Sequence, residues 1–122
     1  MTLPQIDLIV ENVIDAARRM STLFGIEPDE VGERFAQLTV GGMIVMLSPD
    51  ALVPMSAASG VILHVEIEPD VDPRHRAAEA GMTVLHGPVE TDWGTSSTLV
   101  AGPHGVVIDL FRPLQKAASA GF

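Results

Sequence analysis

The chain contains no cysteine and no tyrosine, and its 122 residues include a single tryptophan and very little lysine. Without cysteine the fold cannot rest on disulfide bonds, and a zinc site built on thiolates is excluded. Only 7 basic residues stand against 16 acidic ones, for a net charge of −9. Because phosphate contacts need clustered lysine or arginine, we expect no nucleic-acid partner.

Long apolar runs are also missing. No stretch approaches the roughly 20 residues that a helix needs to cross a bilayer, so we expect no membrane partner. The first residues, MTLPQIDLIVENV, lack a basic segment before their apolar part, which predicts a strand and not a signal peptide. These features favour a cytoplasmic location. The acidic balance fits either plain solubility or the attraction of a cationic ligand, and both readings stay open.

What the chain does contain is 47% hydrophobic residues, arranged in two similar halves. Its length predicts one domain over residues 1–122. Residues 60–113 read as a strand, a helix and three more strands, and residues 1–53 repeat this order more loosely. In the alignment of the halves, LTVGGMIVML matches LVAGPHGVVIDL. We therefore predict two βαβββ modules that meet across a cleft, joined by an irregular linker over 49–59.

Residue spacing gives the expected elements. Asn12 and Asp72 suit the first ends of two helices, and Gly25 and Gly81 suit their last ends. We expect turns over 27–33, a strand buried on both faces over 43–47, and irregular chain between strands at 82–85 and 98–101. Alternation along the strands places residues of like parity on one face. These are Gln5 and Asp7 on the first strand, and Ile62, His64 and Glu66 on the strand that opens the second half.

The ordered motifs LHVEIEPDVD, RAAEAG, HGPVETDWGTSS and AGPHGVVIDLF resemble the vicinal oxygen chelate superfamily. That superfamily includes glyoxalase I, the extradiol dioxygenases and the bleomycin-resistance proteins. The resemblance implies an α+β fold of paired βαβββ modules that form a curved, mixed sheet around a cleft, assembled as a homodimer. The first half departs from the pattern at Asn12, where the superfamily usually has aspartate.

Enzymes that this chain resembles hold a divalent metal on His, Glu or Gln side chains from both modules. The resemblance places the metal slots at Gln5, Met46, Ile62 and Asp109, with His64 as the alternative to Ile62. The metal candidates are therefore Gln5, His64 and Asp109. Because Met46 is a soft ligand and hard cations prefer oxygen, the set is degraded. We favour no cofactor, and a divalent metal is the alternative.

Without a metal, the implied cleft becomes a pocket for a small molecule, as in the bleomycin-resistance proteins. An apolar cavity with a few converging polar groups is the usual form of such a site. We therefore expect sequestration of a small cationic or aromatic ligand, such as an antibiotic or natural product. The predicted ligand-binding residues are Asp7, Met46, His64, Glu66, Trp93, Val107, Asp109 and Phe111.

Two enzymatic alternatives stay open beside this hypothesis. One is a metal-dependent, glyoxalase- or dioxygenase-like lyase or oxidoreductase. The other is a metal-free enzyme with His64 and Glu66 as candidate catalytic residues for acid–base chemistry. Structural interpretations also remain: His64 as a hydrogen-bonded core histidine, Asp109 as the partner of Arg34, and Trp93 as a cover for a sheet edge.

Overall fold

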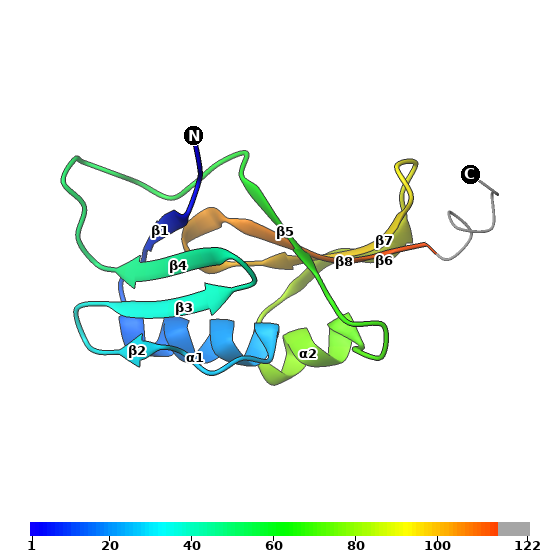
Figure 1. Cartoon of the computed structure of the whole chain (residues 1–122), viewed down its shortest axis with the longest axis horizontal. Helices are drawn as coiled ribbons and strands as arrows, with labels where there is room; N and C mark the ends of the chain where they lie inside the picture. Colours follow the sequence, from blue (N-terminus) through cyan, green and yellow to red (C-terminus); the bar gives the residue numbers. More distant parts are fainter. Residues whose placement is uncertain (115–122) are drawn as a thin grey trace.

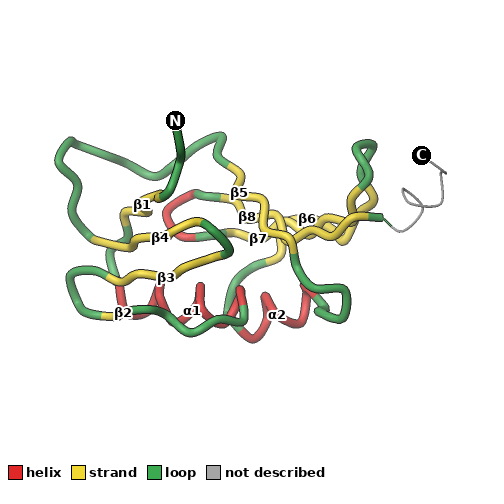
Figure 2. Tube along the Cα trace, viewed as in Figure 1, coloured by secondary structure: helices red, strands yellow, loops and turns green. Residues whose placement is uncertain are grey.

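A computed structural model describes residues 1–114 and contains the two predicted βαβββ modules (Figure 1). The first comprises β1 (Gln5–Ile9), α1 (Val13–Phe24), β2 (Glu30–Val31), β3 (Ala36–Val40) and β4 (Met43–Ser48). The second comprises β5 (Ile62–Glu66), α2 (Pro73–Glu79), β6 (Val84–Glu90), β7 (Thr95–Ala101), the 3-10 turn η1 (Pro103–Gly105) and β8 (Val107–Pro113). Both helices lie along one side of the molecule, with strands beside them (Figure 2).

The strands form two four-stranded sheets with the same internal order. The first sheet runs β1-β4-β3-β2 and the second runs β5-β8-β7-β6. In each sheet the first strand of the module lies parallel to the last, and the other neighbours are antiparallel. This repeated mixed topology confirms the predicted α+β fold.

The helices begin and end at the residues that the sequence predicts. The Asn12 side chain accepts a hydrogen bond from the Asp15 amide at 3.0 Å, and Asp72 accepts one from the Arg74 amide at 3.0 Å. These side chains satisfy amides that have no partner within the first helical turn. At the other end of α1, Gly25 adopts a left-handed conformation with φ of 68°, which glycine reaches without steric cost.

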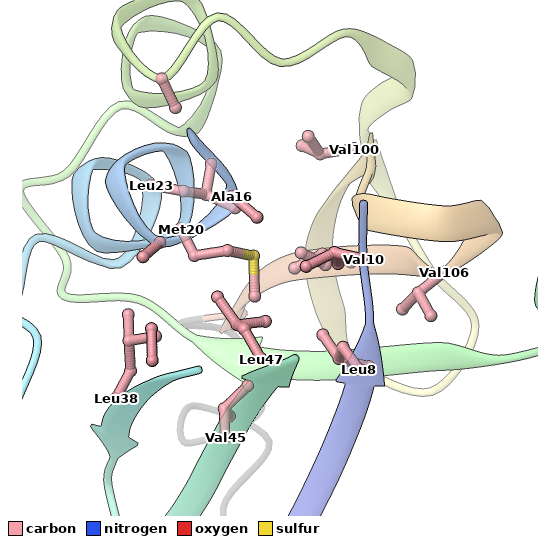
Figure 3. Packing of buried hydrophobic residues seen from close by; sticks show 14 of the residues in the cluster. Leu8, Val10, Ala16, Met20, Leu23, Leu38, Val45, Leu47, Val100 and Val106 are labelled. Carbon is pink, nitrogen blue, oxygen red and sulfur yellow. The ribbon is translucent and has the colours of Figure 1, made fainter. Parts of the chain in front are cut away.

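One buried core connects the two modules. On α1, Met20 points toward Leu47 of β4, and Leu38 of β3 lies on the same side of the first sheet (Figure 3). Val10 from the first module belongs to the same hydrophobic cluster as Val100 from the second. Because each helix covers one face of a sheet, the other face of each sheet is left without a helix. We call these the helix-free faces.

Arginines tie the two helices together at their ends. Arg19 on α1 donates to the Gly81 carbonyl oxygen beyond α2 at 2.5 Å and to the Asp15 carboxylate at 2.8 Å. Hydrogen bonds from Arg19 and then Arg18 lower the pKa of the Asp15 carboxyl. In return, Arg76 on α2 lies against Gly25, where a Cβ atom would sit 2.2 Å from its Nη1 atom. Each module therefore contacts the helix end of the other.

The end of the linker between the modules is hydrogen-bonded to η1. The Ala58 amide donates to the His104 carbonyl oxygen at 2.8 Å. Gly105 lies beneath it with φ of +85°, and a Cβ there would meet the Ala58 carbonyl oxygen at 2.3 Å. Within residues 1–114, no helix has the length and apolar character needed to cross a membrane.

Three expectations about local structure are wrong. The segment between the predicted strands at 82–85 and 98–101 is a hairpin, because β6 continues to Glu90 and β7 begins at Thr95. The register of β6 shifts between Val84 and Val89, so bulges carry the strand through a stretch that reads as a break. The turn region 27–33 contains the short strand β2. Strand β4 is fully buried on one face only.

The assignment of core residues predicts that substitutions at two neighbouring residues of β3 differ greatly in their effect on stability. Leu38 is fully buried against α1, whereas Thr39 is exposed on the helix-free face. We expect Leu38→Ala to lower the free energy of unfolding by about 2–5 kcal/mol, through lost burial and the cavity left behind. Thr39→Ala should cost less than about 1 kcal/mol. Urea unfolding of both variants measures this, and equal costs would contradict the assignment of faces.

Candidate functional site

Strand register places most of the predicted site residues on the helix-free face of the second sheet. His64 of β5 is paired with Asp109 of the parallel strand β8, and Glu66 is paired with Phe111. Val107 precedes them on the same face, opposite Ile62. Asp7 and Met46 are paired on the helix-free face of the first sheet. The register therefore brings His64 and Asp109 together, as neither position alone could reveal.

The centre of this face is a hydrogen bond between an imidazole and a buried carboxylate. His64 Nδ1 lies 2.8 Å from Asp109 Oδ2. The Asp109 side chain is 3% exposed, whereas that of His64 is 55% exposed. An ionised carboxylate only accepts hydrogen bonds, so beside one Nδ1 must carry the hydrogen, and the lone pair of a neutral imidazole is then on Nε2. The expected alternative pairing of Asp109 with Arg34 is wrong, because Arg34 donates to Asp50.

A row of hydroxyl groups on the same face leads from the β6–β7 hairpin tip to this pair. Thr91 Oγ1 lies 2.8 Å from Thr95 Oγ1, which lies 2.9 Å from Ser97 Oγ. Ser97 Oγ in turn donates to Asp109 Oδ2 at 3.2 Å. Because the carboxylate accepts, the Ser97 hydrogen points to Asp109, and this leaves Ser97 to accept from Thr95. The carboxylate therefore sets the direction of the row.

A pocket of about 270 Å³ opens over these groups, lined by His64, Trp93, Thr95, Asp109 and Phe111. Trp93 lies at the tip of the β6–β7 hairpin and is 71% exposed. The hairpin tip stands away from the rest of the sheet (Figure 1). Phe111 meets His64 edge to face, with ring centroids 6.3 Å apart. The pocket thus has aromatic walls and polar groups grouped around His64 and Asp109.

One buried oxygen of Asp109 has no partner among the described residues. Oδ2 accepts from His64 and Ser97, while Oδ1 is buried with no hydrogen-bond donor. Arg112, the arginine on β8, does not supply this donor, because it donates to the Pro69 and Val71 carbonyl oxygens. A buried carboxylate oxygen without a donor is costly, and because Asp109 also lines the pocket, a ligand is a candidate for the missing partner.

The remaining predicted residues lie outside this pocket. The Gln5 amide nitrogen donates to the Asp7 carboxylate at 2.8 Å, both on the first sheet. Neither they nor Met46 are among the residues that line the pocket, and the same holds for Glu66 and Val107 on the second sheet. Sequence reasoning missed Ser97, Thr95 and Thr91. The threonines in the run TSST, a residue type enriched in strands, are the signal that could have revealed a strand there.

Comparison with family models and with curated proteins finds no match. Among solved structures, a "conserved domain protein" is 41% identical, with a TM-score of 0.78 and coverage of 93% of this chain and 99% of its own. The chain belongs to the family of that protein. A glyoxalase-related enzyme from Fulvimarina pelagi is 17% identical, with a TM-score of 0.79 and coverage of 92% of this chain and 88% of its own.

A glyoxalase/bleomycin resistance protein/dioxygenase family enzyme from Burkholderia phytofirmans PsJN matches with a TM-score of 0.76 at 18% identity. It covers 93% of this chain and 100% of its own. These similarities confirm the fold that the resemblance implied: the chain has a glyoxalase/bleomycin-resistance-like fold.

The donors in this chain do not fit the metal that proteins of this fold usually bind. Within residues 1–114, no three His, Cys, Asp or Glu side chains lie close enough together to hold a metal ion. His64 Nδ1 and Asp109 Oδ2 are bonded to each other, and the slot positions Met46 and Ile62 carry no hard donor. A catalytic divalent site needs about three protein ligands, and one chain does not assemble them here.

The row of hydroxyl groups predicts that replacing two adjacent serines of β7 by alanine lowers the free energy of unfolding by different amounts. Ser97 is 3% exposed and hydrogen-bonded to Asp109, whereas Ser96 lies on the opposite side of the strand and is partly exposed. Ser97→Ala should lower the free energy of unfolding by about 1–3 kcal/mol, because it removes a donor to a buried carboxylate. Ser96→Ala should change it by about 0.5 kcal/mol or less. Chemical denaturation decides, and a Ser97→Ala protein as stable as wild type would refute the network.

Proposed function

We propose that this chain binds a small, flat molecule with a positive charge, without a metal, in the pocket over His64 and Asp109. The observation that carries the proposal is the buried Asp109 Oδ1, which has no donor among the described residues although Asp109 lines the pocket. A cationic N–H group of the ligand would supply that donor. Hydrogen bonds between charged partners are the strong ones, so this contact would dominate specificity.

The walls of the pocket support a flat ligand. Trp93 and Phe111 both line it, and aromatic rings stack on planar groups and attract cations over their faces. The overall charge of −9 favours the approach of a cation over that of an anion. The volume of about 270 Å³ suits a molecule on the order of ten heavy atoms, by scale with the 150 Å³ cavity that takes benzene.

His64 would provide the second polar contact. Its Nδ1 is held by Asp109 and its side chain is 55% exposed, so Nε2 would be the nitrogen that accepts from a ligand. An N–H or O–H group of the ligand can donate to this lone pair. A planar cation with N–H donors, such as an amidinium, would supply a donor to either acceptor, Asp109 Oδ1 or His64 Nε2.

The test uses Trp93, because it is the only tryptophan and the chain has no tyrosine. Its fluorescence therefore reports on this pocket alone. We expect benzamidinium to bind at least about tenfold more tightly than its neutral isostere benzamide, as a charge-assisted hydrogen bond is worth about 1.5–3 kcal/mol. Asp109→Asn should abolish this preference. Asp7→Asn, on the first sheet, is the matched control and should retain it.

Two results would contradict the proposal. One is that neither probe, nor any member of a panel of aromatic cations, changes the Trp93 signal. The other is a preference for benzamidinium that survives in Asp109→Asn at its full size. A response equal in wild type and Asp7→Asn but lost in Asp109→Asn assigns the charge recognition to the buried carboxylate.

A second candidate function is metal-free acid–base catalysis, favoured by the carboxylate–imidazole pair. A histidine whose Nδ1 is held by a buried carboxylate presents Nε2 as a general base. Glu66 lies two residues further along β5 on the same face and would be the second titrating group. Both hypotheses share the pocket, and turnover of a bound substrate would separate them.

The incomplete donor set leads to a prediction about metals. We expect Ni²⁺, Zn²⁺, Mn²⁺ and Fe²⁺ to leave the thermal midpoint unchanged within about 1 °C, and EDTA to leave benzamidinium affinity unchanged, because bound metal stabilises the folded state by mass action. Differential scanning fluorimetry and elemental analysis check this. Stoichiometric metal with a rise of several degrees, lost in His64→Ala, would favour the metalloenzyme alternative with Gln5, His64 and Asp109 as ligands.

A protein that binds a small molecule and catalyses no reaction would act by holding or carrying that molecule. We propose that residues 1–122 form one domain that sequesters or carries its ligand, in the manner of a resistance protein, as a cytoplasmic homodimer. In support, large apolar side chains of the second module are exposed in one chain, with Ile62 48% and Trp93 71% exposed. Pairing of two copies would cover such faces.

A further inference from the structure

A second pocket lies beside the free edge of β5, between that strand and the first module. It has a volume of about 260 Å³. Its walls on the first module are Met20 and Phe24 of α1, with Val40, Met43 and Val45 of the sheet. These residues belong to or pack against the buried core, so on this side the pocket is an opening into the core.

The lining explains why space remains there. Val40 and Val45 are short side chains, and they face the end of α1 where Met20 and Phe24 lie. Leu63 of β5 closes the other side only in part, since it remains half-buried. Two methionines in the wall can change rotamer at low cost, so the pocket can adapt to its contents.

The chemistry of the wall excludes a charged occupant. No Asp, Glu, Lys or Arg lines the pocket, and its only titratable lining residue, His64, is already bonded to Asp109. A charge placed there would lose its water without gaining a partner, which is strongly unfavourable. An apolar group would gain burial against the side chains of both modules.

The edge of β5 adds one kind of polar recognition. Within residues 1–114, β5 pairs with β8 alone, so its other edge has no strand beside it. The Val61 carbonyl oxygen and the Ile67 amide bond to β8, and strand alternation turns the backbone groups of Ile62 and His64 the other way. Both of these residues line the pocket. Their N–H and C=O groups are available to a ligand at the pocket wall.

We infer that this pocket is a second binding site, for a neutral and largely apolar small molecule with one hydrogen-bonding group. An alcohol, ketone or amide on an apolar body of about ten heavy atoms fits the volume, by scale with benzene in a 150 Å³ cavity. The inference does not rest on the proposed function, because the two pockets share only His64 among their lining residues and have the opposite preference for charge.

The methionine methyl groups provide the test. Met20 and Met43 line the pocket, whereas Met46 is paired with Asp7 on the helix-free face and serves as an internal control. In protein with ¹³C-methyl methionine, benzyl alcohol should shift the Met20 and Met43 signals saturably and leave Met46 and Trp93 fluorescence unchanged. Benzylammonium and benzoate should produce those two shifts at least tenfold more weakly.

A pair of variants isolates the pocket. Val40→Phe fills the pocket and should abolish the benzyl alcohol shifts. If the phenylalanine side chain impairs folding, Val40→Leu is the smaller substitution, and it should weaken the shifts. Thr39→Phe places the same ring on the exposed face of β3 and should leave them intact. Absence of Met20 and Met43 shifts in wild type, or shifts that persist in Val40→Phe, would overturn the inference.

A further outcome concerns a second copy of the chain. If Met20 and Met43 signals change on dilution without any probe, and sedimentation shows dissociation at the same concentration, another subunit covers the pocket. That result would also overturn the small-molecule assignment. Failure of the first proposal has a different signature, an unresponsive Trp93 with normal Met20 and Met43 shifts.

Discussion

Each sheet has one helix to cover it, and this constraint governs the rest of the molecule. A four-stranded sheet has two faces, and apolar side chains such as Leu38 and Leu47 are buried on the side that α1 covers. The opposite face must be made of residues that tolerate water or that bind something. On the second sheet that face carries His64, Ser97 and Asp109, of which two are buried despite their polarity. Buried polar groups on an uncovered face cost stability unless they are satisfied, so their retention there is the main physical argument for a ligand.

The two pockets differ in chemistry because they lie on different sides of β5. Its alternating side chains send His64 to the helix-free face and Leu63 toward the core, so one strand separates a polar, acidic site from an apolar one. The first pocket has a buried carboxylate and aromatic walls, and the second has aliphatic walls and a strand edge. His64 lines both, which makes it the residue through which occupation of one could affect the other.

The module order, the helix limits and the parity of the strands could be predicted from the sequence, because caps such as Asn12 and alternation along β5 are local signals. The pairing of His64 with Asp109 could not, since it depends on the register of two strands 45 residues apart. Ser97 was hidden for another reason: Gly87 and Pro88 read as the end of a strand, but bulges carry β6 past them and extend the hairpin. The resemblance predicted the metal slots. Their poor fit to a metal depends on a contact that the sequence does not show, the hydrogen bond between Asp109 Oδ2 and His64 Nδ1.

The shared core has a consequence for how the molecule comes apart. Val10 is buried in the same cluster as Val100 and Ile108, so neither module can keep its interior dry when the other melts. The arginines that cross between the helices add to this dependence. We therefore expect the two similar halves to unfold together, in one all-or-none transition and not in two successive steps. On that expectation, a substitution that loosens the core of one half would also lower the stability of the helix-free face of the other.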